Sequence, residues 1–254
     1  MTIRSIQLAA AWLFAAIFST GCIIIVPGGC WKETVGGSGN VVTEQREVDE
    51  FSTLNLKDPG KVNLIQGEHC SVEIRTDDNI LQLIHTTVSG KELTIEHQNY
   101  NLKPTTLEFF VTVRQLNGVS IAGSGDVVGK SRFVVDRFSA GISGSGDMRL
   151  EVEAARVESS VTGSGSILLA GSSEFHKAKI TGSGEIDAKA MKSRNAQVFI
   201  TGSGDCMLHC SQVLDAEITG SGDVYYTGRP QVNSRIKGSG EVKGVAAQKF
   251  SLLK

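Results

Sequence analysis

A serine held between two glycines and followed by an acid is the pattern in this chain that most invites a chemical role. Gly-Ser-Gly recurs at intervals of 18 to 21 residues with its first glycine at 123, 144, 163, 182, 202, 220 and 238, and six of these seven copies are followed by Asp or Glu. A hydrolase nucleophile sits in G-x-S-x-G, which none of these serines matches. A dinucleotide fingerprint needs a third glycine in register and a following helix, and Gly123-Ser124-Gly125 has neither. Seven equivalent copies indicate a structural role, so we predict no catalytic residue and no cofactor.

The acids after the tripeptides could be considered as calcium ligands. They are Asp126, Asp147, Glu185, Asp205, Asp223 and Glu241, with Ser166 at the remaining corner. Calcium-binding β-rolls repeat every nine residues with paired glycines, whereas these acids recur every 18 to 21 residues. We therefore interpret them as solvated corner acids.

The histidines and cysteines do not form a recognisable ligand set. His69, His85, His97, His176 and His209 show no H-x-H or H-x₃-H spacing, so we predict no metal site. His176 interrupts an otherwise apolar column and is interpreted as a hydrogen-bonded core or corner histidine. Cys206 and Cys210 lie about 13 Å apart if the strand is extended, too far for a disulfide, and are interpreted as small core residues. Cys30 and Cys70 could pair in an oxidising compartment, and the sequence leaves that open.

The elements that carry the tripeptides are predicted to be strands. The position two residues before each tripeptide is always β-branched and aliphatic: Ile121, Ile142, Val161, Ile180, Ile200, Ile218 and Ile236. Apolar residues recur at every second position on both sides of the tripeptide, with polar residues between them. This alternation is typical of β-strands with one buried face.

A unit of about 19 residues buries its apolar face only by stacking on its neighbours. The fold class that we predict is all-β, a right-handed parallel β-helix with coils of about 18–21 residues, in which the aliphatic column forms an interior ladder. Positive φ or close backbone approach at the corners would explain the glycines. The predicted structural corner residues are Gly123, Gly125, Gly144, Gly146, Gly163, Gly165, Gly182, Gly184, Gly202, Gly204, Gly220, Gly222, Gly238 and Gly240.

Residues 40–118 lack the tripeptide. Short strand patterns run through these residues. They could form a β-sandwich, but we favour irregular early coils of the same solenoid, because the end of a solenoid must be covered. We therefore predict one domain over residues 38–245, with irregular coils at 40–118, regular coils at 119–245, and a C-terminal tail at 246–254.

The N-terminus is typical of an export signal. Arg4 precedes an apolar run from Ile6 to Phe18, and Ser19-Thr20-Gly21-Cys22 follows. That tetrapeptide resembles the lipobox of bacterial lipoproteins, in which the cysteine becomes the acylated first residue. We predict a signal peptide at 1–21, lipidation at Cys22, and an anchor and linker at 22–37. An uncleaved helical anchor through Val26 and simple secretion are the alternatives, and all three place the domain outside the cytoplasm.

Composition agrees with an ordered, non-nucleic-acid-binding protein. The 254 residues are 40% hydrophobic with a formal net charge of -2, which excludes wholesale disorder. Because 25 basic residues balance 27 acidic ones, there is no global attraction to nucleic acid.

Several segments together resemble the bacterial head GIN domain family, which is commonly labelled "putative auto-transporter adhesin". They are 41–48 (Val-Val-Thr-Glu-Gln-Arg-Glu-Val), Phe51, Leu54-Asn55-Leu56, 60–67 (Gly-Lys-Val-Asn-Leu-Ile-Gln-Gly), 77–81 (Asp-Asp-Asn-Ile-Leu) and the repeated Ile-Thr-Gly-Ser-Gly-Asp. The resemblance spans about residues 38–245. It implies an exported, often lipid-anchored β-helix with an adhesin role and no established catalytic residues.

Two function classes remain. The favoured one is a non-enzymatic lipoprotein of the bacterial cell envelope, on the outer membrane or facing the periplasm, whose β-helix contacts a glycan or protein surface. The alternative is a polysaccharide lyase or hydrolase, which would need convergent acids, often with Arg or Lys, on one outward face. The outward columns mix charges instead, as in Arg149, Asp187 and Lys243, or in Lys179, Glu217 and Arg235. The ligand, the membrane leaflet and the oligomeric state are left open.

Overall fold

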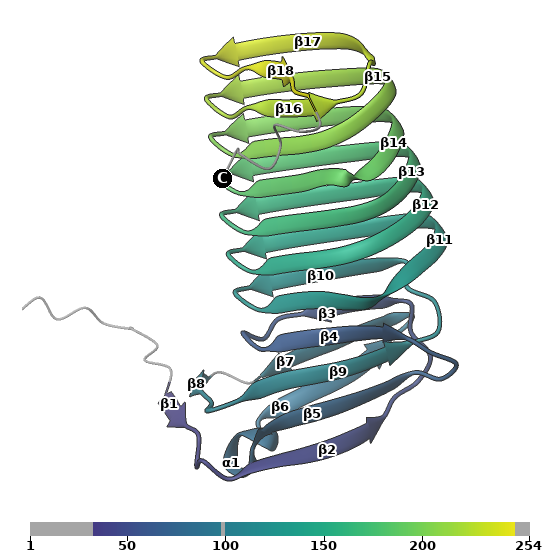
Figure 1. Cartoon of the computed structure of the whole chain (residues 1–254). Coiled ribbons are helices and arrows are strands. Elements are labelled where there is room, and N and C mark those ends of the chain that lie inside the picture. The colour runs from purple at the N-terminus through teal and green to yellow at the C-terminus, as the bar shows by residue number, and fades with distance from the viewer. Residues whose placement is uncertain (1–32, 98–99, 247–254) are drawn as a thin grey trace, which may run out of the picture. The chain divides into compact units, whose positions relative to one another are not determined.

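The regular part of the chain is a β-solenoid built from long strands. In the computed structural model, residues 33–97 and 100–246 are described; the predicted signal segment, Cys22 and Cys30 lie outside them. The strands of this solenoid are β10 (Gly118–Gly123), β11 (Asp126–Gly144), β12 (Asp147–Gly163), β13 (Ser166–Gly182), β14 (Glu185–Gly202) and β15 (Asp205–Gly220). The first of them, β10, ends at the first repeated tripeptide, and each later strand runs from one tripeptide to the next; neighbouring strands pair in parallel (Figure 1). The parallel β-solenoid predicted from the repeat is therefore confirmed.

The final coil is made of shorter pieces. β16 (Val224–Thr227) and β17 (Gln231–Gly238) both pair with β15, and β18 (Val242–Gly244) pairs with β16. Gly228, at φ +101°, lies between the first two of these pieces. One long strand is thus replaced by two at the end of the stack.

The interior ladder forms in the predicted register. The aliphatic residues two positions before each tripeptide are aligned coil by coil from Ile121 to Ile236. From Ile121 through Ile218 their exposed fractions are 0–3%. Ile236 departs from the prediction because its side chain is 40% exposed. It belongs to the last coil, where β17 pairs only with β15 and most side chains are exposed.

The early part of the chain combines solenoid coils with antiparallel strands. β3 (Thr53–Leu56) lies parallel between β10 and β7 (Glu92–His97), and β4 (Lys61–Gln66) lies parallel between β11 and β9 (Leu107–Val113). Beyond them the pairing becomes antiparallel: β6 (Ile84–Ser89) with β7, and β5 (Ser71–Asp77) with both β9 and β2 (Val41–Glu47). A solenoid edge is thereby covered with strands of opposite direction (Figure 1).

Two smaller elements complete this end. β1 (Glu33–Gly36) pairs in parallel with β8 (Tyr100–Lys103). α1 (Asp78–Leu81) is one helical turn directly after β5, and its Ile80 is fully buried. The Asp77-Asp78-Asn79 sequence supplies the polar residues that hold this turn.

The segment between β1 and β2 contacts Asp77 at the end of β5 through two glycines. Gly37-Ser38-Gly39 is another Gly-Ser-Gly, but it does not stack in the repeat. The Asp77 carboxylate accepts hydrogen bonds from Gly39 N at 2.8 Å and from Thr105 N and Oγ1 at 2.8 and 2.7 Å. Burial raises the pKa of this carboxyl, but the three hydrogen bonds outweigh that effect and lower it. A Cβ at Gly37 would lie 2.3 Å from Asp77 Oδ2, so only glycine fits there.

Candidate binding surface

The corners are held by glycine for two separate reasons. The first glycine of each of the seven tripeptides has φ between +117° and +140°, a region that side chains disfavour. Gly123 O accepts hydrogen bonds from Ser145 N at 2.9 Å and Gly146 N at 3.2 Å, so successive corners lie in direct backbone contact. A Cβ at Gly144 would lie 2.2 Å from Gly123 O, and one at Gly146 would lie 2.2 Å from Gly125 O. The tripeptide corners therefore serve to pack the backbones of successive coils closely together.

Three of the six corner acids accept hydrogen bonds from the next coil. Asp126 Oδ1 accepts a hydrogen bond from Asp147 N at 3.2 Å, Asp205 Oδ1 from Asp223 N at 2.9 Å, and Asp223 Oδ1 from Glu241 N at 2.8 Å. Each of these carboxylates satisfies an amide of the next coil. Over residues 33–97 and 100–246, no group of three His, Cys, Asp or Glu side chains is placed to hold a metal ion.

His176 and Ser159 form a buried pair that resembles a nucleophile and its base. Ser159 Oγ lies 2.8 Å from His176 Nε2, and both side chains are buried inside the solenoid. Burial lowers the pKa of His176 to about 4, and its Nδ1 has no hydrogen-bond partner in the described part of the chain. Because the pair lies in the core, it has no access to a substrate and acts as a polar core contact.

The other histidines are dispersed. His97 Nδ1 lies 3.1 Å from the buried Asp58 carboxylate, where burial raises the pKa of Asp58. His209 Nδ1 lies 2.8 Å from Thr227 Oγ1. Each of these histidines contacts a different polar group, and the structure brings none of the predicted histidines together.

Cys206 and Cys210 lie in the core as small buried residues. Both side chains are fully buried and unpaired. Burial raises the pKa of each thiol, and Cys210 Sγ donates to Val213 O at 3.1 Å. Neither cysteine therefore has the character of a reactive thiol.

The outward side of the strands before the corners forms the surface that we call the threonine face. The column next to the corners, which we call the threonine column, consists of Ser143, Thr162, Thr181, Thr201 and Thr219, aligned on successive coils. The neighbouring outward column is chemically mixed, with Ser160, Lys179, Phe199, Glu217 and Arg235 in register. Parallel pairing spaces these side chains about 4.8 Å apart along the stack.

Two shallow pockets lie on the threonine face. One, of about 260 Å³, surrounds Phe199 and includes Glu217 and Arg235. The other, of about 480 Å³, lies farther from the corners, on the earlier strands β11 and β12, and is bordered by Arg137 and Arg156. The sequence analysis did not predict a role for Phe199, Arg137 or Arg156. Phe199 is the only apolar residue of its column from Ser160 to Arg235, which is a signal that could have identified it. Arg137 and Arg156 share a mixed column with Phe175, which gives no such signal.

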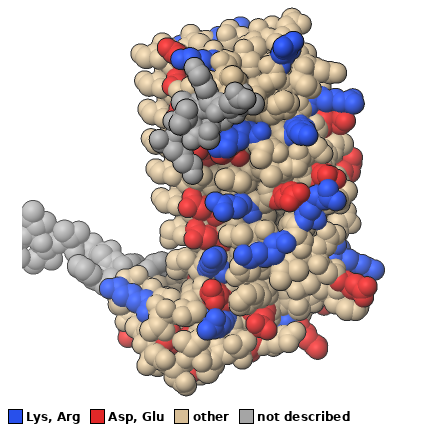
Figure 2. All heavy atoms as spheres, in the orientation of Figure 1, with Lys and Arg blue, Asp and Glu red and all other residues tan. Residues whose placement is uncertain are grey.

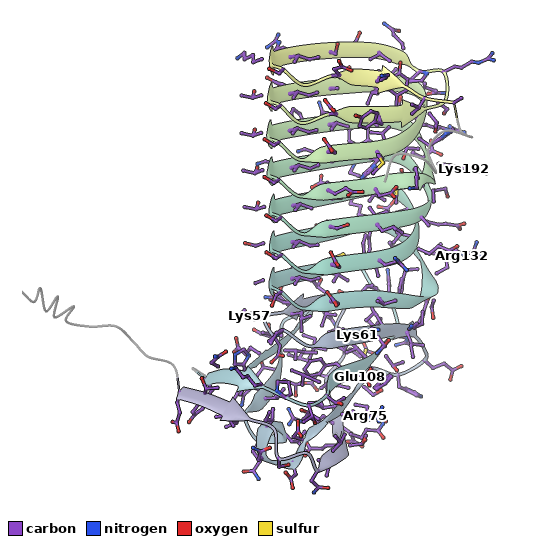
Figure 3. The ribbon with its side chains drawn as sticks, turned by 60° about the vertical axis from the view of Figure 1, so that its left-hand side comes forward. Lys57, Lys61, Arg75, Glu108, Arg132 and Lys192 are labelled. Atoms are coloured by element: carbon purple, nitrogen blue, oxygen red, sulfur yellow. The ribbon has the colours of Figure 1, made fainter. Side chains whose placement is uncertain are left out.

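The outward side of the strands after the corners differs from its prediction at one position. Arg149 and Lys243 are exposed there, but Asp187 is only 6% exposed and pairs with Lys189 at 2.8 Å. Basic and acidic side chains are interspersed across the view in Figure 2. Along the edge away from the tripeptides, Arg132 and Lys192 project outward in Figure 3, and Arg132 pairs with Glu153 at 3.0 Å.

The sequence of the solenoid matches the model of a known protein family. The family described as "Putative auto-transporter adhesin, head GIN domain" matches residues 50–230. This chain belongs to that family. Its head GIN domain thus includes the early coils as well as the regular ones. Among curated proteins, none matches the chain.

Crystal structures with the same fold come from species of Bacteroides and Parabacteroides. A putative adhesin from Bacteroides fragilis superposes with a TM-score of 0.80 at 22% identity, covering 83% of this chain and 100% of that one. A putative lipid binding protein from Parabacteroides distasonis gives 0.73 at 24% identity, and a putative adhesin from Parabacteroides merdae gives 0.69 at 24%. Each of the last two covers 84% of this chain and 100% of its own. At these identities the likeness establishes the fold.

Residues 33–97 and 100–246 include no helix that is long and apolar enough to cross a membrane. The apolar run of the N-terminus lies outside that range, so the anchoring predictions at Cys22 remain predictions.

Proposed function

We propose that this head GIN domain is an exported, non-enzymatic contact module that binds a glycan or protein surface through its threonine face. The observation that carries the proposal is the unbroken alignment of outward side chains over successive coils. Stacked strands hold these groups at fixed spacing before any partner arrives. Such preorganisation lowers the conformational entropy cost of binding.

The interior explains why this face is rigid. Every coil between β11 and β15 pairs with a neighbour on both sides, and its inward side chains belong to one continuous hydrophobic core. Threonine is stiff at χ1 because it is β-branched, so the threonine column loses little rotamer freedom on binding. The face therefore suits many weak polar contacts, with Phe199 as an apolar contact point.

The proposal includes attachment to the bacterial envelope through a lipid on Cys22. It is supported by the position of Cys22 directly after an apolar run and Gly21, and by the family's description as adhesins. Several anchored copies would meet one target surface together, and their effective concentration would raise the overall avidity.

An enzyme on this fold would need acids that converge on one point. On the threonine face each described acid with a register partner on the following coil has a base or an amide there, as Glu217 has Arg235 and Asp215 has Asn233. Asp215 accepts a hydrogen bond from Asn233 Nδ2 at 2.8 Å, which uses one of its oxygens. We therefore propose contact without turnover.

The test compares two faces of the same protein. The full chain in non-ionic detergent is passed over immobilised envelope polysaccharides, host-type glycans and surface proteins, and retention is measured. Thr181→Trp places a bulky ring on the threonine face, at a coil in the middle of the stack. Arg149→Trp places the same ring on the outward side of the strands after the corners. We expect Thr181→Trp to weaken retention at least about tenfold and Arg149→Trp by less than about twofold. Equal retention by both variants, or no retained ligand, would overturn the proposal.

A further inference from the structure

Two arginines on adjacent coils face the same pocket at the margin of the threonine face. Arg137 of β11 and Arg156 of β12 are register partners, so their side chains leave neighbouring strands directly opposite each other. Like charges in that position repel and destabilise a sheet. Both residues line the pocket of about 480 Å³.

Neither arginine is neutralised by a close partner. Arg137 Nε lies 3.7 Å from Asp136 Oδ2, and both side chains are at least 80% exposed, so this contact is weak. Arg156 makes no ion pair with any described residue. Its Cζ instead lies 5.2 Å from the centre of the Phe175 ring, and Phe175 is its register partner on β13. The ring fixes the plane of the guanidinium while leaving its N–H donors unused.

The rest of the pocket offers groups that suit hydroxyls. Gln115, Asn117 and Ser139 provide amide and hydroxyl groups, and Asp136 and Glu158 provide carboxylates. These two acids would repel a bare anion such as phosphate, but they accept hydrogen bonds from hydroxyl groups. A ligand that fits must therefore combine one negative charge for the arginines with several hydroxyl donors for the acids and amides.

The geometry points to an acidic sugar, with Arg137 and Arg156 binding the carboxylate of a uronic acid unit in a glycan. A planar carboxylate matches the donor fork of a guanidinium in a way that a neutral sugar does not. Asp136 and Glu158 would accept hydrogen bonds from ring hydroxyls of the same unit. This assignment rests on the proposed contact function and specifies its ligand class.

The first experiment measures binding of a galacturonate oligomer to the full chain in detergent by calorimetry. Arg156→Gln and Arg137→Gln should each weaken binding at least about tenfold, because a charge-assisted hydrogen bond is lost. Arg149→Gln is the matched control, since it removes the same charge from an exposed position on the same strand and should change binding less than about twofold. Arg156→Lys keeps the charge without the planar fork and should give intermediate binding. Thermal unfolding of each variant checks that the fold is intact.

Three competitors define the ligand chemistry. The methyl-esterified oligomer lacks the negative charge, inorganic phosphate lacks the hydroxyls, and an oligoglutamate peptide has carboxylates without a sugar ring. We expect none of them to compete at the concentration of oligomer that saturates the protein. Equal competition by any of the three, or unchanged binding in both Arg137→Gln and Arg156→Gln, would overturn the assignment.

Failure of this assignment is distinguishable from failure of the contact function. If the chain retains a ligand in a manner sensitive to Thr181→Trp but does not bind the acidic oligomer, the uronic acid assignment is wrong and the contact function stands. If no ligand is retained, both are wrong.

Discussion

Gly123 and Gly144 occupy equivalent corners but differ in what lies beside them. Both have positive φ, at +132° and +140°. A Cβ at Gly123 would meet nothing within 4 Å, whereas one at Gly144 would lie 2.2 Å from Gly123 O. Gly123→Ala should therefore cost about 1–2 kcal/mol from backbone strain alone, and Gly144→Ala roughly 3 kcal/mol or more. Chemical denaturation of the two variants measures the difference; equal losses would show that coil contact does not restrict the corner.

His176 makes the stability of the solenoid depend on pH. Its pKa is about 4 in the folded state against 6.5 for the free group, so acid favours the unfolded chain. The stabilising contribution of the neutral side chain is complete above pH 6.5 and is lost as the pH falls from about 6.5 to 4. The total loss is about 3 kcal/mol, or roughly 1.4 kcal/mol for each pH unit.

A double variant isolates this effect from the titration of carboxylates. Ser159→Ala combined with His176→Leu removes the titrating group and leaves no unpaired serine. The free energy of unfolding is measured in urea at pH 7 and at pH 4.5. Between these two pH values, it should fall by about 2–3 kcal/mol less in the variant than in the parent protein. The same loss in both proteins would mean that His176 is protonated without cost in the folded state.

The interior ladder is the main interaction between neighbouring coils. Ile200 is 1% exposed, while Ile236 occupies the same column on the last coil and is 40% exposed. Ile200→Ala should cost about 2–5 kcal/mol, because it leaves a cavity between two packed coils. Ile236→Ala should cost less than about 1 kcal/mol, because little buried surface is removed. Calorimetric unfolding measures the loss of stability in each variant. Similar losses for the two substitutions would contradict a solenoid that is stabilised by its interior ladder.

The regular coils were predictable because their spacing and alternation repeat. With a fixed offset from each tripeptide, the sequence predicts which residues align, and Ile142, Val161 and Ile180 lie in that alignment. The antiparallel strands β2, β5 and β6 have no such repeat, so their partners depend on tertiary contacts alone. The single turn of α1 is too short to leave a helical period in the sequence.

The candidate site was predictable only in part. The outward position of Lys179, Glu217 and Arg235 followed from strand alternation. The pocket could not be predicted in this way. Arg156 stacks on Phe175 only because these two residues lie opposite each other on neighbouring coils, and the irregular return segments between coils hide that register in the sequence. Asp187 shows the same limit, since alternation places it outward but its pairing with Lys189 leaves it buried.

For the whole molecule, anchoring determines where contact takes place. We expect the mature chain to begin at a lipid-modified Cys22, with two or more acyl chains giving durable attachment at about 0.8 kcal/mol per buried CH₂. Mass spectrometry of the mature N-terminus and membrane fractionation of Cys22→Ser check this. The variant should leave the membrane fraction. An unmodified Cys22 within an intact N-terminal segment would favour the helical anchor instead.

Contact without turnover separates a binding module from an enzyme, and the state of the bound ligand distinguishes the two. A glycan retained by the full chain is incubated with it for many hours, and the size distribution and new ends of the glycan are then measured by mass spectrometry. We expect the glycan to be recovered intact, at the same length as in a sample without protein. Shortened products that disappear on replacing a single outward acid, such as Glu158→Gln or Glu217→Gln, would contradict it and identify the chain as an enzyme.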